Sequence, residues 1–180
     1  MVGTNKGALD TLQRIPRDSV GVEIGVWKGD TSARFLERCG FLHMVDPWAV
    51  EPYQDDDYNA YLKKYAKLTG SLDPADFQKY YDNIYRDVVK RFKDAPVNIC
   101  RCTSYDFFDT FSGHVDWVYI DGLHTFDGCR ADLQNAIKIV REGGWIFGDD
   151  YGNKPEVKRA VDSFGMGFEL FGLNQYAISL

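Results

Sequence analysis

A chain of 180 residues fits one domain, and its 44% hydrophobic and 27% charged residues are typical of a globular protein. The formal net charge of −6 argues against a nucleic-acid partner, because phosphate binding requires a concentrated basic surface. No apolar run approaches the roughly 20 residues that a membrane span needs, and the first residues lack the apolar core of a signal peptide. We therefore expect a cytoplasmic protein with no membrane partner.

Short β-rich segments alternate with helical patterns along the chain, which is typical of a parallel sheet covered by helices. We expect strands at 20–24, 41–45, 97–102, 115–120 and 145–147. Helices are expected at 31–38, with Asp30 or Thr31 as N-cap, at 129–140, ended by Gly143-Gly144, and at 155–164. The runs 168–173 and 175–180 predict a closing antiparallel hairpin.

These elements predict an α/β fold, a Rossmann-like, doubly wound and mostly parallel seven-stranded sheet, in a single domain over residues 1–180. Residues 49–80 form a Tyr- and Asp-rich insertion that is longer than a strand-to-strand crossover requires. A substrate lid is one interpretation, because loops at the carboxyl ends of strands carry function. A solvated helical insertion with packed aromatic side chains is the other, and the sequence leaves both open.

A glycine turn and two carboxylates predict a ligand site at the carboxyl edge of the sheet. Gly25 and Gly29 flank a turn in which the backbone must approach a ligand closely. Glu23, at the end of the first strand, can accept hydrogen bonds from an amino group, and Asp46, at the end of the second, can bind ribose hydroxyls. Trp27 stands where a pyrophosphate would need a bare glycine, so the dinucleotide fingerprint is not met. The pattern favours a ligand with a positive amino group and no phosphates.

Carboxylates also follow the fourth and fifth predicted strands. Asp121 comes directly after 115–120, and Asp149-Asp150 come shortly after 145–147. Neighbouring parallel strands bring these groups to one edge, where the gathered negative charge needs a cation, and oxygen ligands suit Mg²⁺. The alternative, that Asp149 or Asp150 caps the following turn, stays open. His124 lies three residues after Asp121, and an imidazole beside such a site can take a proton from a substrate hydroxyl.

The run VEIGVWKG at 22–29 resembles motif I of class I S-adenosylmethionine-dependent methyltransferases, with Trp27 in place of the usual glycine-rich form. The resemblance extends from about residue 20 to residue 180. It implies that S-adenosylmethionine is the cofactor. The cofactor-binding residues that it implies are Glu23, Gly25, Trp27 and Gly29 around the methionine portion, Asp46 at the ribose, Thr103 and Ser104 on the adenine side, and Asp121.

The acidic and histidine positions are similar to those of metal-dependent O-methyltransferases of the catechol and macrolide-sugar types. In that family an acid after the fourth strand and an acidic pair after the fifth hold Mg²⁺, and a basic residue deprotonates the substrate. The resemblance implies that Asp121, Asp149 and Asp150 bind the metal and that His124 is the catalytic base. The run from Ile120 through Asp132, together with Gly143-Gly144 and the run 149–151, is also similar to a broad methyltransferase family whose members often have no assigned substrate.

We therefore expect methyl transfer to a hydroxyl of a small molecule, a sugar or a phenol, with Mg²⁺ assistance. A nicotinamide-dependent oxidoreductase on a similar sheet is the alternative enzyme, and the missing fingerprint counts against it. A non-catalytic S-adenosylmethionine-binding partner subunit is the alternative from another class. Because the chain has little N-terminal material to cover a substrate, a homodimer or a partner-supplied lid is a further expectation.

Overall fold

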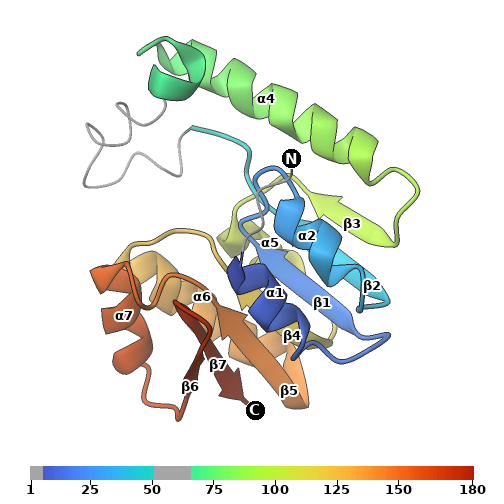
Figure 1. Ribbon diagram of the computed structural model, residues 1–180, viewed down its shortest axis with the longest axis vertical. Helices are drawn as coiled ribbons and strands as arrows, with labels where there is room; N and C mark the ends of the chain where they lie inside the picture. Colours follow the sequence, from blue (N-terminus) through green and yellow to red (C-terminus); the bar gives the residue numbers. More distant parts are fainter. Residues whose placement is uncertain (1–5, 51–65) are drawn as a thin grey trace.

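The computed structural model describes residues 6–50 and 66–180, and within them seven strands form one sheet (Figure 1). The sheet order is β3-β2-β1-β4-β5-β7-β6, in which the first five strands are parallel and β7 is antiparallel to both of its neighbours. This confirms the predicted α/β fold and its closing hairpin. The strands are β1 (Val20–Ile24), β2 (Phe41–Val45), β3 (Val97–Cys100), β4 (Val115–Ile120), β5 (Val140–Gly148), β6 (Glu169–Phe171) and β7 (Gln175–Ser179).

Helices cover both faces of this sheet, as Figure 1 shows. Phe35 and Phe77 pack α2 and α4 against one face, whereas Leu133 and Val157 pack α6 and α7 against the other. Crossover helices on both faces bury a parallel sheet completely, which is why its strands are continuous apolar runs. The helices are α1 (Lys6–Leu12), α2 (Asp30–Phe35), α4 (Pro74–Arg91), α5 (Ser104–Thr110), α6 (Phe126–Ile139) and α7 (Pro155–Asp162).

Aromatic side chains from the central strands anchor the face beneath α2. Phe35 meets the rings of Trp117 and Tyr119 edge-on, at centroid distances of 5.3 and 4.9 Å. All three side chains are fully buried, and each contributes on the order of 1.5–3 kcal/mol by leaving water. The Trp117 ring lies directly over the backbone of Gly21, where an added Cβ would be 2.1 Å from it. This close packing holds β1 and β4 side by side and thereby fixes the spacing of the loops that follow them.

Several expected boundaries are wrong. The fifth strand begins at Val140 rather than at residue 145, the helix after the glycine turn ends at Phe35 rather than at residue 38, and α6 begins at Phe126 rather than at residue 129. The third strand ends at Cys100 rather than at residue 102. The N-cap of α2 is Gly29, in the left-handed conformation and without a side-chain cap, rather than Asp30 or Thr31. Gly143-Gly144 do not end α6, because they lie inside β5.

The glycine pair has a different role within the sheet. The Gly143 N–H donates to the carbonyl of Leu180 at 2.9 Å, and the pairing of β4 with β5 shifts register at this place. A Cβ on Gly144 would lie 2.6 Å from the carbonyl oxygen of Asp116. The pair therefore lets the strand bend where a side chain would collide with its neighbour.

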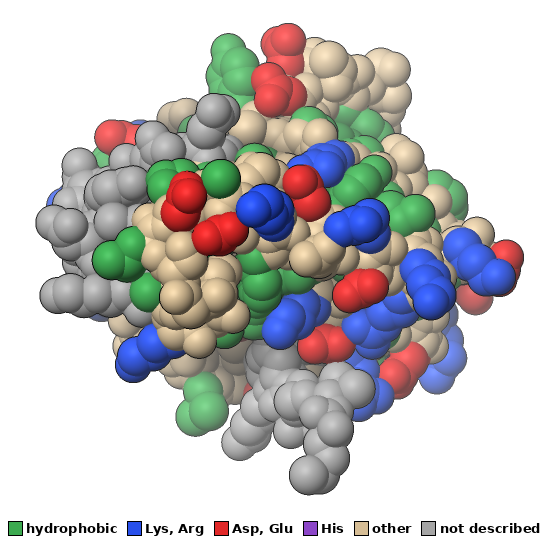
Figure 2. All heavy atoms as spheres, turned by 90° about the horizontal axis from the view of Figure 1, so that it is seen from above, with side chains coloured by type: hydrophobic (Ala, Val, Ile, Leu, Met, Phe, Trp, Pro, Cys, Tyr) green, Lys and Arg blue, Asp and Glu red, His purple; other side chains and the backbone are tan. Residues whose placement is uncertain are grey.

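The Tyr- and Asp-rich insertion lies partly outside the described residues, which omit 51–65, so the lid stays a prediction. Its last part enters α4, where Asp73 caps the helix through the Ala75 N–H at 2.8 Å. On the face that carries α4, basic and acidic side chains are interspersed (Figure 2), and Lys79 pairs with Asp76 at 3.1 Å. Among the described helices, none combines the length and the apolar character that a membrane crossing requires.

Candidate functional site

The turn between β1 and α2 brings backbone unusually close to the loop after β4. Gly25 has φ 91°, and an added Cβ would be 2.0 Å from the carbonyl oxygen of Asp121. Gly29 has φ 73° and packs under the ring of Phe92. A Cβ added to Gly29 would lie 2.6 Å from the nearest carbon of that ring. Both positions need glycine for conformation and for space. The predicted glycine turn therefore lies at the carboxyl edge of the central strands.

Glu23 lies beneath this turn as a fully buried carboxyl group. Its Oε2 accepts a hydrogen bond from the hydroxyl of Ser32, whereas its Oε1 has no hydrogen-bond partner. Burial raises the pKa of Glu23 well above its usual value, against the Ser32 hydrogen bond, which lowers it. An unsatisfied buried oxygen is costly, so a donor from a ligand or a water would stabilise this side chain.

Asp46 has a very different set of partners. Its Oδ2 accepts hydrogen bonds from the N–H groups of Val26 at 3.1 Å and Trp27 at 2.9 Å, and its Oδ1 accepts from the N–H of Trp48 at 2.7 Å. The carboxylate is 3% exposed. Burial raises its pKa, against these three N–H donors, which lower it. In this structure Asp46 therefore anchors the backbone of two loops, and its predicted contact with a ribose stays a prediction.

The two tryptophans held by Asp46 have left-handed backbones, with φ 48° at Trp27 and φ 40° at Trp48. Residues other than glycine rarely adopt this backbone conformation, and holding one in it costs about 1–3 kcal/mol of stability. The indole Nε1 of Trp48 also donates to the carbonyl of Trp27 at 2.8 Å. The hydrogen bonds to Asp46 and the indole hydrogen bond of Trp48 together offset this backbone strain. The indole of Trp27 itself is 46% exposed, with Lys28 Nζ 4.4 Å from its centroid.

A cavity of about 270 Å³ opens beside the glycine turn, between the ends of β1 and β2, the start of α5 and the middle of α6. Of the predicted cofactor residues, Gly25, Thr103 and Ser104 line it. Glu23, Trp27, Gly29, Asp46 and Asp121 are not among its lining residues. Thr103 also caps α5, accepting from the Asp106 N–H at 3.1 Å. The lining residues that sequence reasoning missed are Ile24, Val45, Pro47, Tyr105, Gly122, Leu123, Gly128, Ala131, Asp132 and Asn135.

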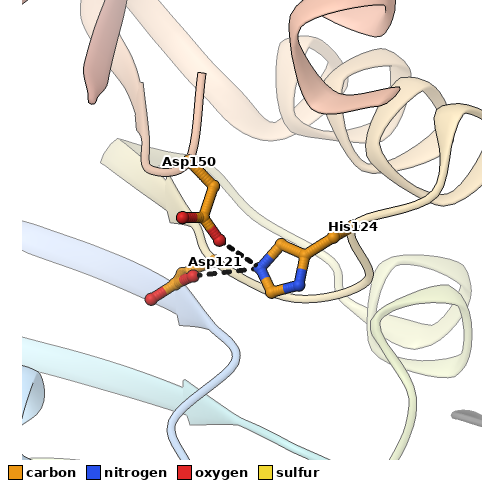
Figure 3. A group of neighbouring side chains, drawn as sticks. All are labelled: Asp121, His124 and Asp150. Atoms are coloured by element: carbon orange, nitrogen blue, oxygen red, sulfur yellow. Dashed lines mark ion pairs between the residues drawn. The ribbon is translucent and has the colours of Figure 1, made fainter. Parts of the chain in front are cut away.

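Asp121, His124 and Asp150 form a cluster (Figure 3). Gly122 and Leu123, which lie between two of these residues in the chain, also line the cavity. The His124 Nε2 lies 2.7 Å from Asp150 Oδ2 and 3.5 Å from Asp121 Oδ1, so the imidazole bridges the loops that follow β4 and β5. The side chains are 40% exposed at His124, 27% at Asp121 and 17% at Asp150, and they are therefore reachable from solvent. Three of the four predicted catalytic and metal residues thus come together.

The charges of this cluster depend on one another. Burial alone would lower the pKa of His124, but hydrogen bonds and charge from Asp121 and Asp150 outweigh it and raise the pKa to about 9. Burial raises the pKa of Asp121 to about 6, against the hydrogen bond from His124. The pKa of Asp150 is lowered, because the His124 hydrogen bond and charge exceed the effect of its burial.

Asp149 lies apart from this group, although it precedes Asp150 directly. Its Oδ1 accepts hydrogen bonds from Gln175 Nε2 and from the Asp150 N–H, both at 2.7 Å, and its Oδ2 accepts from the hydroxyl of Tyr119 at 3.3 Å. Asp150 has φ 67°, a left-handed conformation that turns its side chain toward His124. Asp149 holds this turn in place, and its predicted role as a metal ligand stays a prediction.

The donor atoms of this cluster lie close enough together to hold a metal ion. One donor atom from each of Asp121, His124 and Asp150 lies within 4.8 Å of the others. Mg²⁺ uses one or two carboxylates and keeps several waters, so Asp121 and Asp150 fit it, and the open side leaves room for a substrate oxygen. An imidazole nitrogen is a softer donor that suits transition metals better. The residues present thus fit a hard cation held by two carboxylates.

Comparison with known proteins gives this arrangement a family context. Residues 22–151 match the family model described as a methyltransferase domain, which includes the glycine turn, the cavity and the acidic cluster. An uncharacterized protein of Acanthamoeba polyphaga mimivirus is 30% identical over 109 residues. That alignment covers 56% of this chain and 49% of the viral protein, so the chain matches about half the length of this relative.

Solved structures share the fold at low sequence identity. The O-methyltransferase TomG of Streptomyces achromogenes, involved in tomaymycin synthesis and solved with S-adenosylmethionine, has a TM-score of 0.61 at 15% identity. The match covers 100% of this chain and 81% of TomG. An rRNA methylase of Streptococcus thermophilus has a TM-score of 0.57 at 9% identity, over 93% of this chain and 89% of that protein. Proteins with different acceptors therefore share this backbone.

Proposed function

The chain belongs to the class I S-adenosylmethionine-dependent methyltransferases with this domain, and from that premise we propose that it methylates a hydroxyl oxygen of a small molecule with the help of Mg²⁺. One observation carries this proposal. Gly122 and Leu123 line the 270 Å³ cavity and also border the space beside His124 and Asp121, so the cofactor cavity adjoins the acidic cluster. A cofactor held in this cavity would lie beside a base and two carboxylates.

The proposed roles divide between cofactor and chain. S-adenosylmethionine supplies an activated methyl group, and Mg²⁺ supplies positive charge that lowers the pKa of an acceptor hydroxyl. Asp121 and Asp150 would hold the cation, and they also set the charge of His124. At a pKa of about 9 the imidazole is protonated near neutral pH, so it acts as a base only when the charge of the two carboxylates is compensated. Base and cation therefore depend on each other.

The cofactor contacts proposed here follow from burial and from the cavity. The backbone of Gly25 faces the ligand at the cavity wall, and Thr103 and Ser104 provide hydroxyls on its adenine side. The unpartnered Oε1 of Glu23 offers an acceptor to the ammonium group of the methionine portion, directly or through a water. Orientation in this site supplies a large part of the rate, because methyl transfer requires the acceptor oxygen in line with the donor.

The choice of an oxygen on a small molecule rests on two supports. The cluster joins a base to two carboxylates, a set that suits a hydroxyl more than an amine, because an amine needs no metal to become nucleophilic. The net charge of −6 and the interspersed charges around α4 disfavour an RNA acceptor (Figure 2). We also propose that the chain forms a homodimer, and light scattering of the purified protein tests this oligomeric state directly.

The first experiment separates cofactor classes. Calorimetric titration with S-adenosylhomocysteine is expected to give binding in the micromolar range, and NAD is expected to give none. Repeating the titration with Mg²⁺ and a panel of phenols and sugars identifies acceptors that bind only in the ternary mixture. Binding of NAD in place of S-adenosylhomocysteine would favour the oxidoreductase alternative and sink the proposal.

The second experiment tests the assigned chemistry. His124→Ala and Asp150→Asn are each expected to lower turnover by about 10²–10⁴-fold, the usual contribution of a positioned base or its support, while the affinity for S-adenosylhomocysteine stays within about twofold. Asp127→Asn, an exposed carboxylate at the start of α6, is the matched control and leaves turnover unchanged. A wild-type protein that binds cofactor but methylates nothing in the panel, with or without Mg²⁺, would support the non-catalytic alternative.

A further inference from the structure

The start of β7 places a buried amide beside the end of β5. Gln175 is the first residue of β7, and its neighbour Tyr176 pairs with Gly148 in the antiparallel register. Gln175 itself is 3% exposed, and its Nε2 donates a hydrogen bond to Asp149 Oδ1 at 2.7 Å. The closing hairpin therefore contacts the loop that carries part of the acidic cluster.

The carboxylate that receives this amide also holds the backbone of the next residue. Asp149 Oδ1 accepts from Gln175 Nε2 and from the Asp150 N–H, both at 2.7 Å. On the other side of the turn, the carbonyl of Asn174 accepts a hydrogen bond from the N–H of Tyr151 at 2.9 Å. Both sides of the turn around Asp150 are therefore fastened to the start of β7.

The direction of the Asp150 side chain depends on this turn. Asp150 has φ 67°, and its Oδ2 lies 2.7 Å from His124 Nε2, the shortest contact within the cluster (Figure 3). Residues other than glycine maintain a left-handed backbone only where their surroundings hold it. If the turn relaxed to a negative φ, the Cβ of Asp150 would point in another direction and the contact with His124 would be lost.

Stability alone does not explain why a glutamine stands at this position. An ionised carboxylate only accepts hydrogen bonds, so Asp149 requires the Nε2 side of the amide. The Oε1 atom then faces Gly172, where an added Cβ would lie 2.3 Å from it. No group in the described part of the chain donates a hydrogen bond to this buried oxygen. An apolar side chain of the same size would leave no such oxygen unsatisfied, so the donor to Asp149 is what distinguishes glutamine here.

We propose that Gln175 is a positioning residue, whose amide fixes Asp149 and thereby aims Asp150 at His124. The inference rests on the proposed function, in which Asp150 and His124 belong to the site of the cation and the base. In this role Gln175 touches neither the substrate nor the cofactor. Its effect passes through one hydrogen bond, and loss of that bond loosens the cluster without unfolding the protein.

Gln175→Met tests this role, because methionine keeps the length of an unbranched side chain and removes the donor. The first readout is the ring ¹⁵N resonances of His124 in the metal-free protein at one fixed pH, with the exposed His114 as internal reference. The Nε2 resonance of His124 is expected to shift, because its contact with Asp150 weakens, whereas the resonances of His114 stay in place.

The second readout is the affinity for Mn²⁺, used as the probe cation and measured by electron paramagnetic resonance. Gln175→Met is expected to lower this affinity by about 10–100-fold, the usual effect of removing the partner that orients a metal site. The affinity for S-adenosylhomocysteine is expected to stay unchanged. The melting temperature is expected to equal or exceed that of the wild-type protein, because the variant has no unsatisfied amide oxygen.

Gln134→Met is the matched control, since it makes the same substitution at an exposed position of α6. It is expected to leave the His124 resonances and the Mn²⁺ affinity unchanged. Should Gln175→Met fail to fold, Gln175→Glu removes the same donor in a side chain of the same shape, and it is expected to shift the His124 resonance as well.

The outcomes separate the inference from the proposed function. An unchanged His124 resonance in a folded Gln175 variant overturns the inference while the proposed function stands, and a lowered melting temperature beside it would make Gln175 a purely structural residue. If the wild-type protein binds no Mn²⁺, the cation of the proposed function is lost, and the His124 resonance still decides the role of Gln175. If the wild-type protein binds no S-adenosylhomocysteine, the proposed function fails first and the inference falls with it.

Discussion

Asp46 and the cluster of Asp121, His124 and Asp150 lie at the same edge of the sheet, yet their polar atoms are satisfied in opposite ways. Asp46 is 3% exposed and receives three backbone N–H groups from loops that follow β1 and β2. The cluster is open to solvent, and its carboxylates share a single imidazole. One carboxylate is part of the framework, whereas the others remain available to a ligand.

The difference teaches how to tell a structural carboxylate from a chemical one in this fold. Removing a saturated, buried carboxylate leaves donors unpaired inside the protein, which destabilises the fold. Removing a half-exposed group leaves its partners to water, which changes stability little. Substitution of Asp46 should therefore affect mainly stability, whereas substitutions in the cluster should affect mainly function. Four substitutions test this difference.

Gly25→Ala is expected to have the largest effect on stability. The added Cβ would lie 2.0 Å from the carbonyl oxygen of Asp121 at φ 91°, so the turn must move away from the cluster. Left-handed strain and overpacking together predict a loss of about 4–5 kcal/mol. Chemical denaturation measures it. Gly165→Ala is the control, because φ is 83° and nothing lies within 4 Å, so only about 1–2 kcal/mol should be lost. Equal losses of stability in Gly25→Ala and Gly165→Ala would contradict the close approach of the glycine turn to the loop after β4.

Asp46→Ala comes next, with an expected loss of about 3 kcal/mol, since it strands the N–H groups of Val26, Trp27 and Trp48. The tryptophan fluorescence of the free protein should change as well, because both indoles follow the anchored backbone. Asp73→Ala removes one exposed cap bond to Ala75 and should cost about 1 kcal/mol. Normal fluorescence and a loss as small as that of Asp73→Ala would leave ribose binding as the main role of Asp46.

Asp132→Asn sharpens the comparison, because it removes a carboxylate that is 4% exposed and whose pKa is raised by burial. The folded pKa of about 6 exceeds the ordinary 3.8, so ionisation destabilises the fold progressively as pH rises from 3.8 to about 6. The amide does not ionise, and the variant should be more stable than wild type by about 1–3 kcal/mol at pH 7.5. The advantage should shrink toward pH 4. A destabilised variant at pH 7.5 would mean that Asp132 is saturated like Asp46.

His124→Gln is expected to have the smallest effect on stability, within about 1 kcal/mol, because the imidazole is 40% exposed and its ion pairs are screened by water. Thermal unfolding at matched pH and ionic strength measures it, with Asp127→Asn as the surface reference. If His124→Gln lost as much stability as Asp46→Ala, the cluster would be a structural element like Asp46, and the difference between the two regions would not hold.

Much of the fold was predictable because it depends on local patterns. The bounds of β1, β2 and β4 agree with the apolar runs, since strands buried on both faces are continuous hydrophobic segments. The residues of the site were predictable to the extent that they follow strand ends, because parallel strands deliver their ends to one edge. Asp121, His124 and Asp150 came together for that reason.

The tertiary structure alone decided what each polar group is bonded to. Gly143-Gly144 resembled a helix end, but strand pairing with Leu180 and the carbonyl of Asp116 placed them inside β5. Asp132 gave no signal on its helix, because only the loops of distant strands make its surroundings a cavity. Periodicity is a property of neighbouring residues and can be read from the chain, whereas hydrogen-bond partners and burial belong to segments that meet only after folding.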